Sequence, residues 1–145
     1  MSRKLGDYIP PVKEDGIIVD KGIVSTSASA GIGYATGAGG AVTQATNRTT
    51  GVTLNAISGT ITTNNASLAA EATATFTVTN SAVAIGDVVT VAIQSGTNGG
   101  GTIVFVSTVA AGSFAISVQN NNVAAGTAET GAIIINFAVI KAVSA

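Results

Sequence analysis

The chain contains 145 residues, with a formal net charge of −1 and neither cysteine nor histidine. Charged residues make up 9% of the chain, against about 25% in ordinary soluble domains, whereas hydrophobic residues make up 46%. Without cysteine and histidine, the chain has no disulfides and no thiolate or imidazole chemistry. Its high hydrophobic and low charged fractions differ from those of disordered chains. A net charge near zero argues against nucleic acid as a partner. Since no apolar run is long enough for a membrane helix, we expect one folded domain without metal, cofactor, nucleic-acid or membrane partner.

The first part of the chain holds most of the charge. Residues 1–21 carry eight of the thirteen charged side chains and both prolines. Because consecutive prolines fit neither a helix nor a central strand, residues 1–24 are predicted to be an extended N-terminal arm, followed by a β-sandwich domain over residues 25–145. A terminus without a docking role is the alternative. The candidate docking residues of the arm are Arg3, Lys4, Tyr8, Ile9, Pro10, Pro11 and Val12.

A tract rich in Gly, Ala and Ser covers residues 25–40, after a stretch (residues 16–25) typical of one or two short strands. A phosphate-binding glycine loop would have to open a helix, but residues 41–47 show no amphipathic helical pattern. We therefore interpret the tract as closely packed turns, in which missing side chains let backbone segments approach one another.

From Val52 onward, apolar and polar residues alternate with a period of two, which is typical of half-buried antiparallel strands. The predicted strands cover residues 57–62, 73–79, 87–94, 102–108, 113–119 and 131–143, with a hairpin turn at 109–112. Loops at 95–101 and 120–122 should be exposed, and the only helix candidate is residues 65–72. Seven or eight strands joined by short turns predict an all-β antiparallel sandwich or jelly roll.

The last predicted strand is apolar on both faces. Its two faces consist of Ile133, Ile135, Phe137 and Val139, and of Ala132, Ile134, Asn136, Ala138 and Ile140. A strand of this kind should lie centrally in its sheet, with a core on one side and further protein, such as a second subunit, on the other. We take Ile133, Ile135, Phe137 and Val139 as the candidate oligomer interface.

The case for catalysis would have to rest on three carboxylates outside the arm, Glu71, Asp87 and Glu129, each beside a predicted turn. Paired-carboxylate hydrolysis needs two of them about 5–10 Å apart. Three solvated turn charges are the simpler interpretation, so we expect no enzyme and no catalytic residues. Calcium binding would rest on Glu14, Asp15 and Asp20, whose spacing departs from the usual acidic calcium loop.

One strand presents a row of threonines, at positions 73, 75, 77 and 79, which Thr60 and Thr62 of another strand could extend. Such a flat surface of hydroxyls and methyls could order water or bind glycans. The simpler interpretation is that threonine favours strands and keeps the outer face of a sheet wet.

Several segments resemble small virion proteins of tailed bacteriophages, of the capsid decoration (cement) or head-fibre type. These segments are residues 31–44, 47–55, 57–63, 76–81 and 135–141, so the resemblance spans residues 31–141 and leaves out the arm. It implies a β-rich subunit that assembles as a symmetric oligomer, most often a trimer, on a virion surface. It brings no catalytic residues with it.

Together, these observations predict a structural protein, made in the host cytoplasm, that decorates the outer surface of a phage head and stabilises it. Its partners would be further copies of itself and the major capsid protein. The alternative is a head-fibre or tail-spike module that binds surface glycans through the threonine face or the loop at residues 96–101. The small number of aromatic residues, 4% of the chain, argues against this alternative because sugar sites usually include an exposed ring.

Overall fold

The computed structural model describes residues 25–29, 31–98, 100–123 and 126–142. The predicted arm, with its seven candidate docking residues, and the calcium candidates therefore lie outside the described residues. Residues 25–33 belong to a separate unit of the chain, and its described residues are exposed and form no strand. The second unit begins at Tyr34 and contains every strand that the structure describes.

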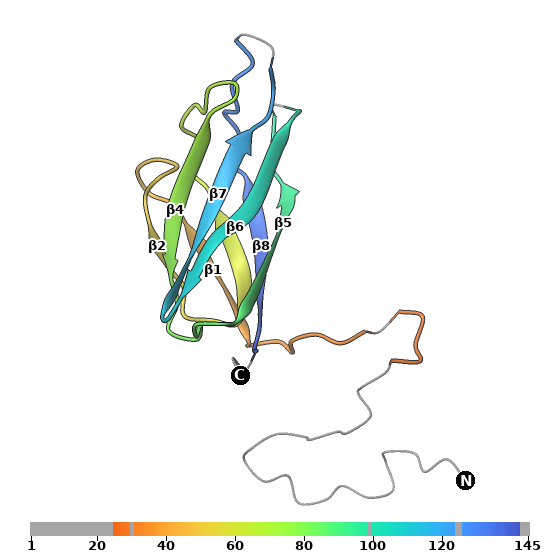
Figure 1. Cartoon of the computed structure of the whole chain (residues 1–145). Helices are drawn as coiled ribbons and strands as arrows, with labels where there is room; N and C mark the ends of the chain where they lie inside the picture. Colours follow the sequence, from red (N-terminus) through yellow and green to blue (C-terminus); the bar gives the residue numbers. More distant parts are fainter. Residues whose placement is uncertain (1–24, 30, 99, 124–125, 143–145) are drawn as a thin grey trace, which may run out of the picture. The chain divides into compact units, whose positions relative to one another are not determined.

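The described residues fold into two four-stranded sheets that pack face to face (Figure 1). The first, which we call the β8 sheet, has the order β1 (Gly39–Thr43), β3 (Ser58–Thr62), β8 (Ile134–Ile140), β5 (Val88–Ser95). The second, the β7 sheet, has the order β2 (Val52–Thr53), β4 (Thr73–Thr79), β7 (Ser113–Asn120), β6 (Thr102–Ala110). The predicted all-β sandwich is confirmed. No described residues form a helix that could cross a membrane.

Two strand pairs are parallel, whereas the alternation predicted antiparallel strands. These pairs are β1 with β3 and β2 with β4, and the other four pairs are antiparallel. The cause is the path of the first four strands, which pass from one sheet to the other at every step. Each second strand therefore returns to the same sheet in the same direction, as parallel neighbours require a crossover.

The core follows the predicted alternation closely. In β4, Ala74, Phe76 and Val78 point inward and are buried, while the four threonines are exposed. The β6–β7 hairpin is also confirmed, with a turn at Ala111–Gly112 that is shorter than expected. Across the core, the rings of Phe114 in β7 and Phe137 in β8 lie 5.3 Å apart between centroids and are tilted by 51°. Such tilted aromatic contacts add to the stabilisation from burial.

The strand β8 is central in its sheet, as predicted, between β3 and β5. Its inward face consists of Ile133, just before the strand, with Ile135, Phe137 and Val139, and these side chains are 0–4% exposed within the single chain. The chain itself therefore covers the four residues taken as the oligomer interface, and a second subunit cannot contact them. The reason is the two-layer architecture, in which the β7 sheet packs on this face. Any subunit contact on β8 falls on the opposite face, around Asn136 and Ile140.

The helix candidate at residues 65–72 is not helical. Leu68 instead forms a bridge with Glu129, in which each backbone N–H donates to the other's carbonyl at 2.9 Å. Glu71 has a φ of 60°, in the left-handed region that ends a right-handed helix. Eight residues without a packed apolar face are too few to resist this pairing.

The glycine tract is closely packed only at its end. A Cβ on Gly40, in β1, would lie 2.7 Å from Leu54 Cδ1, and one on Gly59, in β3, would lie 2.7 Å from the Gly40 carbonyl oxygen. Earlier in the tract, a Cβ on Gly31, Gly33 or Gly37 would meet no atom within 4 Å. The Leu54 side chain therefore explains Gly40 at the end of the tract, whereas Gly31, Gly33 and Gly37 lie in open turns.

Candidate functional site

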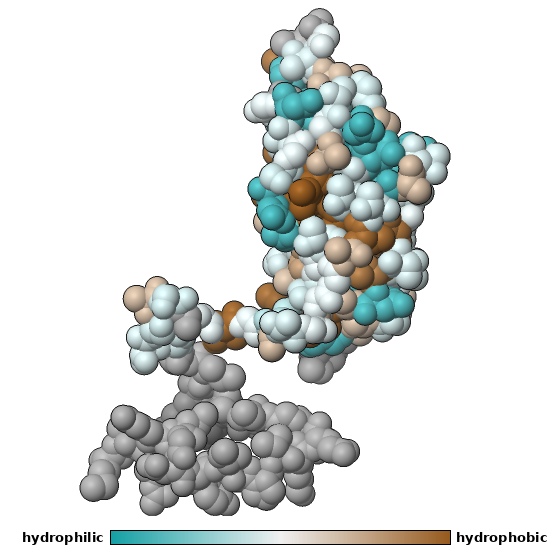
Figure 2. Space-filling view, turned by 180° about the vertical axis from the view of Figure 1, so that it is seen from behind, coloured by the Kyte–Doolittle hydropathy of each residue, from teal (hydrophilic) through white to brown (hydrophobic). Residues whose placement is uncertain are grey.

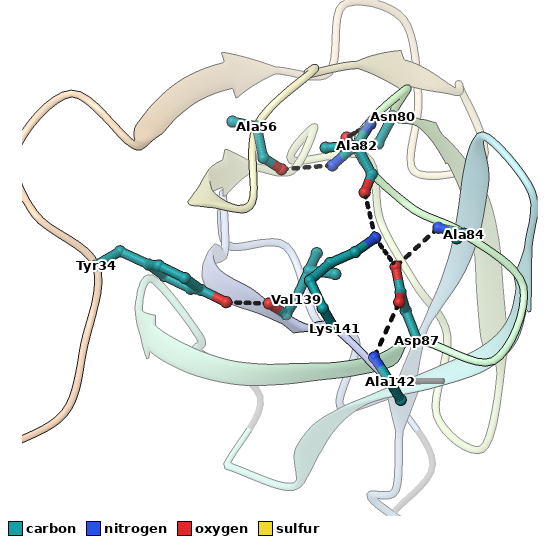
Figure 3. A network of polar contacts seen from close by, with 9 residues as sticks. All are labelled: Tyr34, Ala56, Asn80, Ala82, Ala84, Asp87, Val139, Lys141 and Ala142. Atoms are coloured by element: carbon teal, nitrogen blue, oxygen red, sulfur yellow. Dashed lines mark hydrogen bonds and ion pairs between the residues drawn. The ribbon is translucent and has the colours of Figure 1, made fainter. Parts of the chain in front are cut away.

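At the end of the sandwich where β8 finishes, Lys141 and Asp87 form an ion pair (Figure 3). The ammonium also donates to the Ala82 carbonyl at 2.9 Å, and the carboxylate accepts from the backbone N–H of Ala84 at 2.8 Å and of Ala142 at 3.2 Å. The side chain of Asp87 is 0% exposed and that of Lys141 is 55% exposed. The pair thus ties the connection between β4 and β5 to the chain that follows β8.

The pKa of Asp87 is held below its usual value. The N–H of Ala84 contributes most to this lowering and Lys141 comes next, while burial acts in the opposite direction. The carboxylate is therefore charged at neutral pH. It serves as an electrostatic anchor for the loop and is poorly suited to act as an acid.

Two further side chains close the same end. The buried Asn80 donates from its amide to the Ala56 carbonyl at 2.7 Å and accepts from the N–H of Ala82 at 3.0 Å. The Tyr34 hydroxyl donates to the carbonyl of Val139 in β8, next to the start of β3 (Figure 3). Tyr34, at the start of the sandwich, is therefore held beside the last residues of β8.

A second polar network surrounds Arg48, which is 3% exposed. Its guanidinium donates to the Ala66 carbonyl at 2.5 Å, Thr63 Oγ1 at 3.2 Å, the Glu129 carbonyl at 3.2 Å and the Gly131 carbonyl at 2.8 Å. Burial lowers the pKa of Arg48, and the negative charge of Glu129 opposes this shift. Arg48 also borders a hollow of about 260 Å³, but its donors are directed to the chain's own oxygens and are not available for an anion.

The carboxylate of Glu129 lies in the same region and is fully buried. It accepts from the backbone N–H of Gly131 at 2.7 Å and of Asn98 at 3.2 Å, and from Thr102 Oγ1 at 2.5 Å. Arg48 and Glu129 therefore join loops from four parts of the chain. A buried charge of either sign is tolerated here because donors and acceptors surround it.

The interpretation of the three carboxylates as solvated turn charges is wrong for two of them, since only Glu71 is exposed. Asp87 directly precedes β5, and Asn98, which binds Glu129, follows the same strand. Eight residues of strand span about 26 Å, well beyond the separation of about 5–10 Å in a catalytic pair. Asp87 and Glu129 therefore cannot act together. Within the described residues, no three acidic side chains gather where they could hold a metal ion.

The threonine surface differs from the predicted one. Thr60 and Thr62 belong to β3 in the β8 sheet, so they cannot extend the row on β4, which lies in the other sheet. The neighbour of that row is β7, where Ser117 Oγ lies 2.7 Å from Thr75 Oγ1. Ser117 in turn pairs with Phe105 of β6, whose side chain is 41% exposed. An aromatic ring thus lies on the same face as the hydroxyls.

The outer face of the β8 sheet is covered by small, uncharged side chains with apolar ones between them (Figure 2). A shallow depression of about 200 Å³ lies over β5 and β8, beside Thr90, Ala92, Asn136 and Ala138. Thr60 donates to Asn136 Oδ1 at 3.3 Å across this face. The face is flat and uncharged, which suits contact with another protein surface better than enclosure of a small ligand.

Comparisons of the chain with protein-family models, curated proteins and solved structures gave no match. The resemblance to virion proteins therefore remains a prediction.

Sequence reasoning missed Arg48 and misjudged Asn120. Arg48 is the only charged residue between positions 22 and 70, and this isolation in a charge-poor stretch was the available signal of a buried role. Asn120 was predicted to be exposed in a loop, but it is fully buried and donates to the carbonyls of Leu68 and Thr127 at 3.1 and 2.9 Å. Polar loop residues look alike in sequence whether they face solvent or unpaired backbone groups.

Proposed function

We propose that the chain is a structural virion protein that decorates the outer surface of a phage head as an oligomer and stabilises it. The observation that carries this proposal is that ionisable side chains of the sandwich hold its own loops in place. Arg48, Asp87 and Glu129 all bind the chain's own loops, and two uncharged sheet faces remain for contact. The resemblance of residues 31–141 to decoration and head-fibre proteins supports the same function.

In the proposed mechanism, the arm at residues 1–24 docks on the capsid shell and the sandwiches associate with one another, most simply as trimers. A protein that binds the assembled shell but not its separated subunits stabilises the shell by mass action, by about 2.7 kcal/mol per site at a hundred times Kd. Linking several arms in one oligomer raises the apparent affinity further. The subunit contact would use outward residues, since the inward face of β8 is covered.

The first test is the mass of the full chain in solution, measured by size exclusion with light scattering. A value near three times the chain mass of 14.0 kDa is expected. A monomer at micromolar concentration would contradict the trimer.

The second test is binding to phage heads assembled without this protein, followed by co-sedimentation and by the thermal transition of the heads. The full chain should bind and raise the transition temperature. Deletion of residues 1–21 should abolish binding and leave a folded oligomer. Retained binding, or loss of folding, would contradict the role of the arm.

A second candidate function is recognition of neutral glycans, and the position of Phe105 favours it. The ring lies in one row with Ser117 and Thr75 on an uncharged face, which supplies the exposed aromatic surface that the sequence did not reveal. Glycan-array binding that disappears in Phe105→Ala and in Thr75→Val/Thr77→Val would support this function. An array without signal for the full chain would exclude it for the glycans tested.

A further inference from the structure

The exposed large apolar side chains of the sandwich are unevenly distributed. Among its described residues they are Tyr34, Ile85, Val88, Ile103, Phe105, Val123 and Ile140. Four of them lie at the end where β8 finishes and β5 begins, and we call Tyr34, Ile85, Val88 and Ile140 the end patch. They are 44%, 70%, 51% and 55% exposed, respectively. Clustered apolar exposure of this kind marks interaction surfaces.

Strand pairing and one hydrogen bond place three of these residues side by side. Val88 and Ile140 are paired across β5 and β8 and both point outward. Tyr34 is bound through its hydroxyl to the carbonyl of Val139, the residue next to Ile140 (Figure 3). The patch therefore begins on the outer face of the β8 sheet and continues to the residue at which the chain enters the sandwich.

The polar network at this end holds the fourth residue in place. Ile85 lies in a turn closed by a hydrogen bond from the Asp87 N–H to the Ala84 carbonyl at 3.2 Å. The carboxylate of Asp87 accepts from the N–H of Ala84 and pairs with Lys141, which follows Ile140. The apolar side chains are thus carried by a backbone that is already ordered, and a fixed backbone lowers the entropy lost on binding.

The place where the chain enters the sandwich indicates what covers this patch. The sandwich begins at Tyr34, within the patch, and residues 1–24, which are proposed to dock on the capsid, precede it by only nine residues. Nine residues span at most about 30 Å, so a surface held by the arm lies within reach of the patch. The effective concentration of that surface at the patch is on the order of millimolar.

We propose that the end patch docks on the same capsid surface as the arm, through an apolar contact. This inference rests on the proposed decoration function. In this arrangement, the end of the sandwich that carries Tyr34 and Ile140 contacts the shell. The opposite end, around Asn98, faces away from the shell.

The test uses the full chain and phage heads assembled without it, with Kd measured by co-sedimentation. The variant Ile85→Ser/Ile140→Thr changes one loop residue and one strand residue, both outside the core. The matched control, Val123→Ser/Ile103→Thr, also changes one loop and one strand residue, both exposed and both toward the opposite end. Circular dichroism should show equal melting for the two variants.

The patch variant should bind heads about tenfold more weakly or worse, as expected for the loss of central apolar contacts, and the control should bind as the unmodified chain does. Equal affinity of the two variants would overturn the inference. So would a patch variant that loses its oligomeric mass, because the patch would then join copies of the chain. If the unmodified chain does not bind heads at all, the decoration function itself fails, and this outcome is distinct from either of the others.

Discussion

Replacing Arg48 by Met tests whether the buried ionic network holds the sandwich together. The methionine side chain fills a similar length of space but removes the guanidinium. Four hydrogen bonds of 2.5–3.2 Å disappear, three of them to backbone carbonyls, and the buried carboxylate of Glu129 loses its positive neighbour. Thr63 and Glu129 are 1% and 0% exposed, so the oxygens of these two residues lose a partner that water does not replace.

At about 1 kcal/mol for each hydrogen bond, the loss is about 4 kcal/mol, which agrees with the range of about 3–5 kcal/mol for removing one partner of a buried ion pair. A domain of this size has about 5–15 kcal/mol of stability in total. With a shift of about 4 °C for each kcal/mol, the melting temperature should fall by about 15 °C.

Thermal and urea unfolding followed by circular dichroism measures this loss. Arg48→Lys serves as the control, since it keeps the charge but loses the forked geometry, and it should fall between the other two proteins. Adding Glu129→Gln to Arg48→Met should cost less than the sum of the single changes, because the two residues interact. A free energy of unfolding for Arg48→Met within 1 kcal/mol of the unmodified chain would refute the reasoning.

Three further changes test other parts of the structure. Ile135→Asp places a charge in the core and should leave aggregate or unfolded chain by size exclusion and circular dichroism, whereas Asn136→Asp, one residue on and exposed, should stay folded. Gly96→Ala should destabilise far more than Gly112→Ala in urea titrations. Both glycines have positive φ, but a Cβ on the first would lie 2.1 Å from a carbonyl oxygen and a Cβ on the second would meet nothing within 4 Å. Because a backbone N–H and a lysine ammonium lower the pKa of Asp87 in the folded state, its contribution to stability is complete above the unfolded pKa of about 3.9 and is lost as the pH falls through the folded pKa. Urea midpoints between pH 2 and 7 should therefore fall less steeply on the acid side for Asp87→Asn, and identical curves would show that the carboxylate does not contribute.

Strand positions could be predicted because one physical rule decides them. In a two-layer sandwich each strand has one wet and one dry face, so the alternation in Thr73–Thr79 specifies both the strand and the side that is buried. The same rule identified β8 as central, because apolar residues on both faces do not suit an edge. It could not say which of the two faces met the core, since either choice leaves isoleucines outside.

The pairing of strands could not be predicted from alternation. A two-residue strand such as β2 has no detectable period, and β1 consists mostly of small residues that carry little pattern. If these two strands are not recognised, the sequence does not show that the chain passes from one sheet to the other. The strands β3 and β4, which follow one another in the sequence, are then taken as neighbours. The threonines of β3 and β4 were joined into one surface for this reason, although they lie on opposite sides of the molecule.

The few charged residues of the sandwich show how a chain of small side chains can have well-defined ends. Strand pairing and the apolar core order the middle of the molecule, but the connecting loops contain few large apolar residues that could anchor them. Arg48 with Glu129 secures one set of loops, and Asp87 with Lys141 secures the loop at the end of β8. These ionic groups hold the loops in place, as hydrophobic contacts hold the strands. Protonation of Asp87 should therefore loosen the end patch, because its carboxylate holds the turn that carries Ile85, and binding to heads should weaken as the pH falls through the folded pKa of Asp87.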